Sequence, residues 1–194
     1  MKLFVSAFLL LVYLNVIGQV GQTRNWIDSE VKLTDSKGNT VKVTHSFPKG
    51  GGEVHQNGKK YSYVIFWTRM SNQSANSVEL KVKYPDVTYF KSPDSYIQIV
   101  LPRESMKNEK EQLYDYGLTN LQSLLNDESK QLGVLQKEIK PKEDYIFYTA
   151  VFIHISGWGP SRAKFELKEQ NLFYKINMGA ETTLIPCGSL KFIN

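Results

Sequence analysis

Apolar and polar residues alternate strictly along several stretches of the chain. Residues 78–84 read Val-Glu-Leu-Lys-Val-Lys-Tyr, so every second side chain is apolar and those between are charged. Residues 41–47 and 162–168 alternate in the same way. A period of two places successive side chains on opposite faces of a strand. These stretches therefore predict half-buried strands with one solvated face.

Two further segments are apolar at nearly every position. Residues 61–70 and 145–155 carry aromatic and β-branched side chains with few polar interruptions. Such residues favour strands, and continuous apolar runs are typical of strands that are buried on both faces. We therefore expect two central strands, each covered by another layer on both sides or by one layer and a helix.

Residues 108–126 follow a helical spacing instead. Asn108 and Glu111 fit the capping box that begins many helices. An apolar stripe of this kind predicts one amphipathic helix that packs on a sheet. The apolar residues that form the stripe are Leu113, Tyr114, Leu118, Leu121, Leu124 and Leu125.

Turn-forming residues separate the expected strands. Residues 35–39 (Asp-Ser-Lys-Gly-Asn) predict a hairpin loop, and residues 50–58, with three consecutive glycines and Asn57-Gly58, predict a longer loop. Counting the shorter runs near residues 132–139, 172–177 and 189–193, we expect about nine or ten strands. The sequence therefore predicts a mainly β fold, an antiparallel β-sandwich of immunoglobulin-like or related type, with one inserted helix near 108–126.

The first residues predict export. Lys2 precedes an apolar run over residues 3–17, and Gly18 follows it. A cation, a short apolar run and small residues are the parts of a secretory signal peptide, cut here after Gly18 or Gly21. The run is shorter than the ~20 residues that a membrane-spanning helix needs.

The domain organisation follows from the predicted signal peptide. Residues 1–18 form the signal peptide and residues 19–194 form a single β-sandwich domain, whose length suffices for one core. No second apolar run is long enough to span a membrane. We therefore expect a protein released into the periplasm or the extracellular space, without a transmembrane segment in the mature chain.

Composition narrows the class of protein. The net charge is only +5, and lysines and glutamates are interspersed, whereas nucleic-acid binders usually carry a clustered basic stripe. Cys187 is the single cysteine, so the chain holds no internal disulfide and depends on its 41% apolar residues for stability. Cys187 is either a buried apolar residue or the site of an intermolecular bridge. Asn72-Gln73-Ser74 matches the N-glycosylation pattern, but we interpret it as a polar turn.

Motifs for catalysis or metal binding are missing from the sequence. It contains neither Gly-x-Ser-x-Gly nor a phosphate-binding glycine motif. His45, His55 and His154 are widely separated, which is unlike a zinc site. His45 fits a hydrogen-bonded core position, and His55 a solvated loop. Paired carboxylates can converge from distant positions, so a hydrolase remains an alternative, but we expect no enzyme, cofactor or metal.

One loop offers a candidate binding site. Residues 156–162 (Ser-Gly-Trp-Gly-Pro-Ser-Arg) follow His154, which ends the more buried of the two central strands. An exposed Trp158 with Arg162 nearby is an arrangement that stacks on a sugar ring or grips a protein partner. The alternative is a Trp158 that folds back over the end of the sandwich. Trp158, Arg162 and His154 are the predicted ligand- or partner-binding residues.

Five short strings of the chain stand out together: Phe47-Pro48-Lys49-Gly50-Gly51, Tyr114-Asp115-Tyr116-Gly117-Leu118, Ile139-Lys140-Pro141-Lys142-Glu143, Leu172-Phe173-Tyr174-Lys175-Ile176 and Ile185-Pro186-Cys187-Gly188. Together they resemble a group of uncharacterised exported bacterial proteins of this length. The resemblance covers most of the mature chain and implies no activity, ligand or catalytic residue. The turn Pro141-Lys142-Glu143-Asp144 also resembles the corner before a strand in bacterial immunoglobulin-like modules.

Three functions remain open at this point. The leading hypothesis is a non-enzymatic, monomeric β-sandwich that binds or scaffolds a protein or glycan partner at the cell envelope. The second is a carrier that holds a small apolar ligand between the sheets, because pockets of this kind are lined by aromatic and aliphatic side chains. The third is a hydrolase with a site that the sequence does not reveal.

Overall fold

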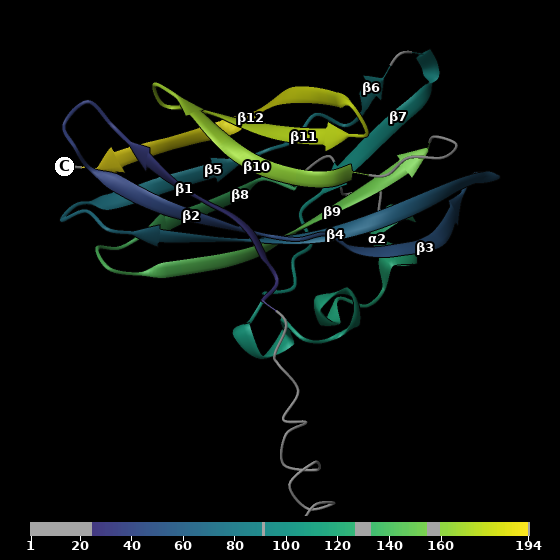
Figure 1. The fold of residues 1–194 in the computed structure, drawn as a ribbon, viewed down its shortest axis with the longest axis horizontal. Helices are drawn as coiled ribbons and strands as arrows, with labels where there is room; N and C mark the ends of the chain where they lie inside the picture. Colours follow the sequence, from purple (N-terminus) through teal and green to yellow (C-terminus); the bar gives the residue numbers. More distant parts are fainter. Residues whose placement is uncertain (1–24, 91, 127–132, 155–159, 194) are drawn as a thin grey trace, which may run out of the picture.

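The computed structural model describes residues 25–90, 92–126, 133–154 and 160–193. The predicted signal peptide lies outside these residues. Two antiparallel sheets face each other across a common core, as the sequence predicts for a β-sandwich (Figure 1). Within the described ranges, no helix is long and apolar enough to cross a membrane.

The larger sheet has seven strands and the smaller has five. In the larger sheet the order is β1 (Ile27–Thr34), β2 (Thr40–Ser46), β4 (Lys59–Asn72), β9 (Asp144–His154), β7 (Ser92–Val100) and β6 (Thr88–Phe90), and β3 (Lys49–Gln56) pairs with β4. In the smaller sheet the order is β10 (Pro160–Lys168), β11 (Asn171–Met178), β12 (Glu181–Ile193), β5 (Ser77–Val82) and β8 (Leu135–Ile139).

The strand count differs from the expected nine or ten, because the described residues form 12 strands. β3, β6 and β7 were not predicted. The three glycines of β3 resemble a loop in sequence, yet they lie in a strand that pairs with β4 across an irregularity between Gly50 and Glu53. β12 is also longer than the expected residues 189–193, because it begins at Glu181.

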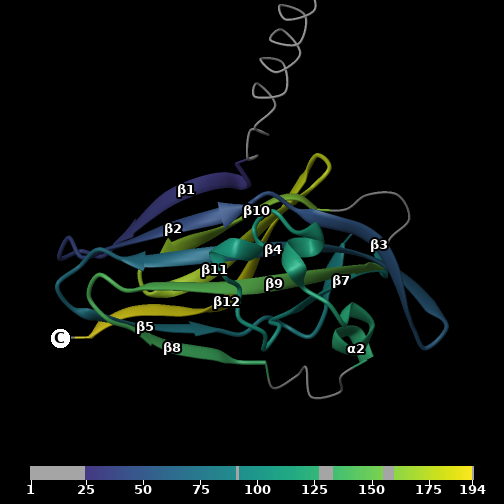
Figure 2. The ribbon, with the colours of Figure 1, turned by 90° about the horizontal axis from the view of Figure 1, so that it is seen from below.

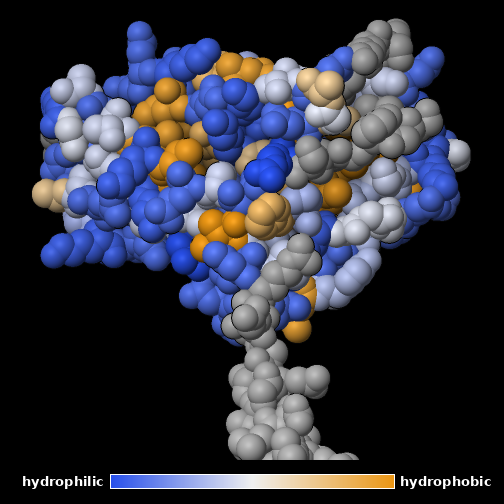
Figure 3. Space-filling model, in the orientation of Figure 1, coloured by the Kyte–Doolittle hydropathy of each residue, from blue (hydrophilic) through white to orange (hydrophobic). Residues whose placement is uncertain are grey.

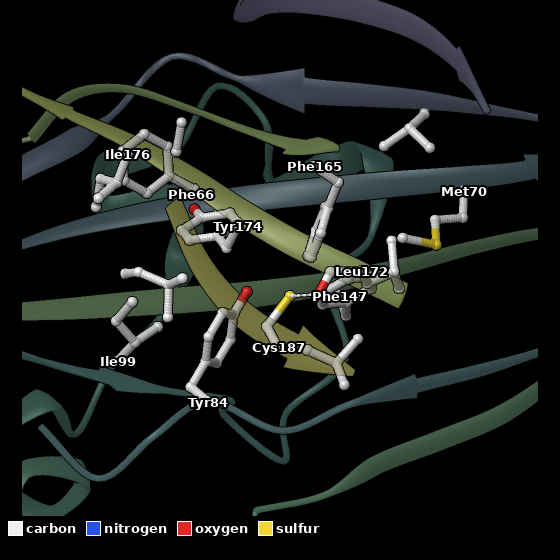
Figure 4. Close-up of a cluster of buried hydrophobic side chains, with 14 of the residues drawn as sticks. Phe66, Met70, Tyr84, Ile99, Phe147, Phe165, Leu172, Tyr174, Ile176 and Cys187 are labelled. Carbon is white, nitrogen blue, oxygen red and sulfur yellow. Dashed lines mark hydrogen bonds between the residues drawn. The ribbon is translucent and has the colours of Figure 1, made fainter. Parts of the chain in front are cut away.

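Large side chains from both sheets fill the space between them. Phe66 and Phe147 come from the seven-stranded sheet, and Phe165, Tyr174 and Cys187 come from the other (Figure 4). All five are at most 3% exposed. The thiol of Cys187 donates to the carbonyl of Leu172 over 3.4 Å, which favours the buried reading over an intermolecular bridge.

A second apolar cluster lies on the opposite, outer face of the seven-stranded sheet. It is covered by residues 101–126, which we call the strap (Figures 1 and 2). The two central strands, β4 and β9, are therefore buried on both faces, by the second sheet on one side and by the strap on the other. This confirms the sequence prediction for both strands.

The continuous helix predicted near residues 108–126 is wrong. The strap holds two short 3-10 turns, η1 (Asn108–Lys110) and η2 (Tyr114–Gly117), and one six-residue helix, α2 (Leu121–Asn126). Asp115, Tyr116 and Gly117 have φ angles of 47°, 55° and 68°, which interrupt any right-handed helix.

The capping box is also wrong, and for a definite reason. The side chains of Asn108 and Glu111 both contact the guanidinium of Arg69 on β4, at 2.7 and 3.4 Å. These contacts hold the start of the strap against the sheet. The two side chains therefore serve tertiary packing instead of a helix N-terminus.

Asn72 ties the two sheets together at one corner of the sandwich. Its side-chain amide donates to the carbonyls of Asn76 and Ile139, at 2.8 and 3.0 Å. Its side-chain oxygen accepts from the backbone N–H and the hydroxyl of Ser74. Because the residue is only 2% exposed, these bonds leave no amide group open to modification.

We expect Asn72→Asp to lower the free energy of unfolding by about 2 kcal/mol at neutral pH. The substitution keeps the shape but removes both N–H donors, so the carbonyl of Ile139 loses this side-chain donor and the carbonyl of Asn76 keeps only the hydroxyl of Ser74. Chemical denaturation monitored by circular dichroism measures the loss. Ser74→Ala is the control, because it deletes one hydroxyl donor of the same corner and leaves both N–H donors of Asn72 in place. An equal loss in both variants would contradict the role given to the Asn72 amide.

Candidate functional site

The outer face of the seven-stranded sheet beneath the strap is strongly aromatic. Alternation along β4 places Tyr61, Tyr63 and Trp67 on this face, and β9 adds Tyr148. These side chains are at most 7% exposed, so they form a floor under the strap and not an open surface. The strap contributes Tyr116, which packs edge-to-face on Trp67.

Lys49 of β3 fixes the strap to this floor. Its ammonium lies 3.8 Å from the ring centre of Trp26 and 4.2 Å from that of Tyr116. The same group donates to the backbone carbonyls of Glu111 and Leu113, at 2.6 and 2.8 Å. Cation–π contacts and charge-assisted bonds of this kind are stronger where water is excluded. Lys49 therefore fixes the position of the strap backbone just before η2.

Tyr63 of β4 holds Asp115 of the strap against the sheet. The phenol of Tyr63 donates to Oδ2 of Asp115 over 2.8 Å, and Asp115 is 3% exposed. Burial raises the pKa of both groups. A Cβ on Gly52 would lie 2.7 Å from the Tyr63 hydroxyl. The glycines of β3 thus leave room for the ring of Tyr63 to reach Asp115.

The backbone of η2 is strained and firmly held. Three consecutive residues with positive φ, two of them not glycine, cost energy that surrounding contacts must offset. The hydroxyl of Tyr116 donates to the carbonyl of Phe47 over 2.6 Å, and that of Tyr148 donates to the carbonyl of Tyr116 over 2.7 Å.

This anchored turn presents two apolar side chains to solvent. Leu113 is 51% exposed and Tyr114 is 75% exposed. Figure 3 shows apolar residues at the lower tip of the described part, where Figure 1 places the strap.

His154 belongs to a separate cluster at the far end of the same face. Its ring centre lies 5.2 Å from Tyr61 and 5.0 Å from Tyr96, and its Nδ1 lies 2.9 Å from the carbonyl of Lys60. Because only a protonated Nδ1 can donate to that carbonyl, the neutral ring carries its lone pair on Nε2. The two tyrosine hydroxyls are 2.8 Å apart, and Lys59 donates to that of Tyr96 over 3.3 Å.

Tyr61 acts in the cluster around His154 as a hydrogen-bonding group. Burial and the neighbouring hydroxyl of Tyr96 raise the pKa of Tyr61, so its phenol stays protonated at neutral pH. The half-buried imidazole and the exposed Lys59 are the groups that a ligand would meet. This placement suits binding of a polar partner.

Arg162, the other predicted site residue that the structure describes, has partners other than the cluster around His154. Arg162 of β10 forms an ion pair with Asp28 of β1 over 2.8 Å, and its guanidinium lies 5.7 Å from the ring centre of Phe47. The Asp28 side chain is only 4% exposed, so the pair ties the two sheets together at this side of the sandwich. Trp158 lies outside the described residues.

Groups for metal or thiol chemistry are not gathered in the described part of the chain. There, no three His, Cys, Asp or Glu side chains lie close enough together to hold a metal ion. Burial raises the pKa of the Cys187 thiol, which makes it a poor nucleophile.

Sequence reasoning singled out His154, whose binding role stays a prediction, but did not single out Lys49, Tyr63 or Asp115. The alternation of aromatic residues in β4 was a usable signal for Tyr63. No protein-family model matches the chain, and comparisons with curated proteins and with solved structures found no significant match.

Proposed function

We propose that this protein is an exported, non-enzymatic binding module that docks a protein partner at the cell envelope through Leu113 and Tyr114. The strained turn that holds these two side chains in solvent carries the proposal. The export part of the proposal rests on the N-terminal sequence pattern.

The turn at Asp115 and Tyr116 costs conformational energy. Left-handed conformations at Asp115 and Tyr116 are unfavourable, and backbone strain of this kind is concentrated at functional sites. Burying Leu113 and Tyr114 would be the cheaper outcome for an isolated domain. Instead Lys49 and Asp115 hold the backbone that exposes them.

Rigid exposure of this kind favours binding. Tyrosine is enriched among the residues that dominate protein interfaces, and a preorganised loop loses little entropy when a partner docks. His154 lies on the same outer face of the sheet, so a partner that covers the strap can extend toward it. Trp158 and Arg162 remain predicted contacts of this kind.

The test compares two double variants of the mature protein. Leu113→Ser with Tyr114→Ser is expected to weaken co-sedimentation with envelope preparations of the exporting host at least about tenfold, because two interface anchors are lost. Both side chains are exposed, so the melting temperature is expected to stay the same. The matched control, Leu184→Ser with Ile193→Ser, removes exposed apolar side chains of the five-stranded sheet.

Pretreatment of the envelopes identifies the class of partner. Loss of binding after protease treatment is the expected result. Retained binding after protease, with loss after glycan hydrolysis, would replace the protein partner by a glycan. Equal weakening in both double variants would overturn the assignment to the strap.

A further inference from the structure

A side chain, and not another strand, closes the second edge of β3. Among the described residues β3 pairs with β4 alone, so its other edge lies at a margin of the larger sheet. α2 of the strap lies beside the hairpin of β3 and β4 (Figure 2). The backbone N–H of His55 donates to Oε1 of Gln122 on α2 over 3.0 Å. In return, Nε2 of Gln122 donates to the carbonyl of His55 over 2.5 Å.

The register of the hairpin explains why both backbone groups of His55 are available to Gln122. Asn57 and Gly58 have φ angles of 51° and 73°, which fit the two-residue turn that is typical of hairpins. Gln56 belongs to the strand pair that closes this turn, so His55 belongs to the next pair, which shares no hydrogen bonds. The N–H and C=O of His55 therefore point away from β4. Because these directions repeat every two residues, the N–H and C=O of Glu53 point the same way.

The amide of Gln122 imitates the peptide group of a neighbouring strand. It exchanges one donated and one accepted hydrogen bond with a single residue, which is the contact that an added antiparallel strand would make at His55. Peptide recognition by strand addition depends on backbone bonds of this kind. Gln122 is exposed, so it is a small cover that a strand can displace, and Glu53 beside it is exposed as well. This edge therefore matches the backbone of an extended peptide.

The edge of β3 also adjoins the docking surface at Leu113 and Tyr114. β3 begins at Lys49, whose ammonium donates to the carbonyl of Leu113 over 2.8 Å. Gly51 follows within the strand, and a Cβ built on it would meet nothing within 4 Å, so this part of β3 leaves room for another chain. A protein that covers the exposed turn of the strap therefore lies next to β3 from the first residue of that strand.

We infer that the protein partner adds an extended segment to the free edge of β3 and displaces the amide of Gln122 there. This rests on the proposed function, because it describes how that same partner binds. The segment exchanges backbone hydrogen bonds with Glu53 and His55, while Leu113 and Tyr114 provide the apolar anchors. Side chains of the segment lie alternately on the two faces of the extended sheet.

Glu53→Pro removes the outward N–H of residue 53 from the edge. Proline is tolerated in an edge strand where its missing N–H faces out of the sheet, so we expect β3 to remain paired with β4. Co-sedimentation of the mature protein with envelope preparations of the exporting host is expected to weaken at least about tenfold, because the added strand loses a hydrogen bond and meets the proline ring. The matched control is Lys60→Thr, which loses the same ion pair with Glu53, keeps every backbone N–H and is expected to bind like the parent. Melting temperatures of both variants verify the fold.

Gln122→Ala tests the displacement of the side-chain amide. We expect it to bind envelopes at least about threefold more tightly, because the partner no longer competes with Gln122 for His55. Ser123→Ala, at the next exposed position of α2, is the control and is expected to bind like the parent. Size-exclusion chromatography without envelopes is expected to show monomers for both variants. Dimers of Gln122→Ala alone would replace the protein partner by a second copy of this chain.

The variants separate strand addition from the anchors at Leu113 and Tyr114. Normal binding by Glu53→Pro, with loss in the double variant of Leu113 and Tyr114, would overturn strand addition alone. The reverse result would support strand addition and overturn the two anchors. Equal losses in Glu53→Pro and Lys60→Thr would overturn the role of the backbone of β3. Unchanged or weaker binding by Gln122→Ala would overturn the displacement of its amide.

Discussion

Gly188→Ala is expected to destabilise the fold by more than about 4 kcal/mol, a loss reached only when a substitution disrupts the core or the backbone. Gly188 lies in β12 with a φ of 134°, a conformation that side chains rarely allow. A Cβ built on it would lie 1.9 Å from the carbonyl oxygen of Lys81 on β5. Because that atom belongs to the backbone of a paired strand, the two strands would have to separate.

Chemical denaturation of the purified variant measures this loss, and failure to accumulate in the exporting host is a second expected sign. Gly51→Ala is the matched control. Gly51 also has a positive φ, of 103°, but an added Cβ would meet nothing within 4 Å. We expect it to cost about 1–2 kcal/mol through strain alone. A similar cost in both variants would contradict the close approach of β12 to β5.

The same glycine explains why β12 was only partly predicted. Leu172 pairs with Gly188 and Phe173 with Pro186, so Cys187 is the extra residue of a β-bulge. Ile185 and the bulge residue Cys187 are buried, and beyond the bulge the next buried residue is Leu190, so the inward-facing positions shift by one residue. A prediction that relies on strict alternation ends the strand where the inward-facing positions shift by one residue. The proline within the strand adds to the difficulty, because it is normally a sign of an edge or a break.

The fold class was predictable because its signals are local. Alternation in β5 and β10, and the doubly apolar runs of β4 and β9, reflect the faces that each strand buries. These signals correctly indicated two layers and a further cover over the central strands. They do not indicate what form that cover takes.

The strap shows why helical spacing misled the prediction. Leu118 and Leu125 are buried as expected, but Leu113 and Tyr114 from the same apolar stripe are exposed. A chain of short turns can bury the required side chains on a flat sheet as well as a helix can. The decisive contact is between Tyr63 and Asp115, 52 positions apart in sequence. No local pattern records a contact of this kind, so most of the candidate site was out of reach.

Acidification is expected to destabilise the protein through His45. This residue is 1% exposed between the rings of Phe165 and Tyr174, and its ring nitrogens face the hydroxyl of Thr68. Burial lowers the pKa of His45 from 6.5 to about 3. The unfolded chain therefore takes up a proton near pH 6.5, whereas the folded chain does not until about pH 3.

The direction and the size of the change in stability follow from the difference between the pKa of His45 in the unfolded chain and in the folded chain. Stability due to neutral His45 is fully present above pH 6.5 and is lost as the pH falls toward 3. Linkage predicts a loss of about 2 kcal/mol between pH 7 and pH 5, and about 3 kcal/mol by pH 4. Denaturation curves at each pH measure it.

His45→Leu isolates this contribution, because leucine fills a similar volume and does not titrate. Asp115 acts in the opposite direction, since burial raises its pKa and its protonation favours the folded chain. That contribution is common to both proteins and cancels when His45→Leu is compared with the parent. The difference between their stabilities is therefore expected to change by about 2 kcal/mol from pH 7 to pH 5.

His55→Gln, which changes an exposed histidine of β3, is expected to follow the parent. If His45→Leu followed the parent as well, neutral burial of His45 would be wrong, and the ring would have to be accessible to protons in the folded chain.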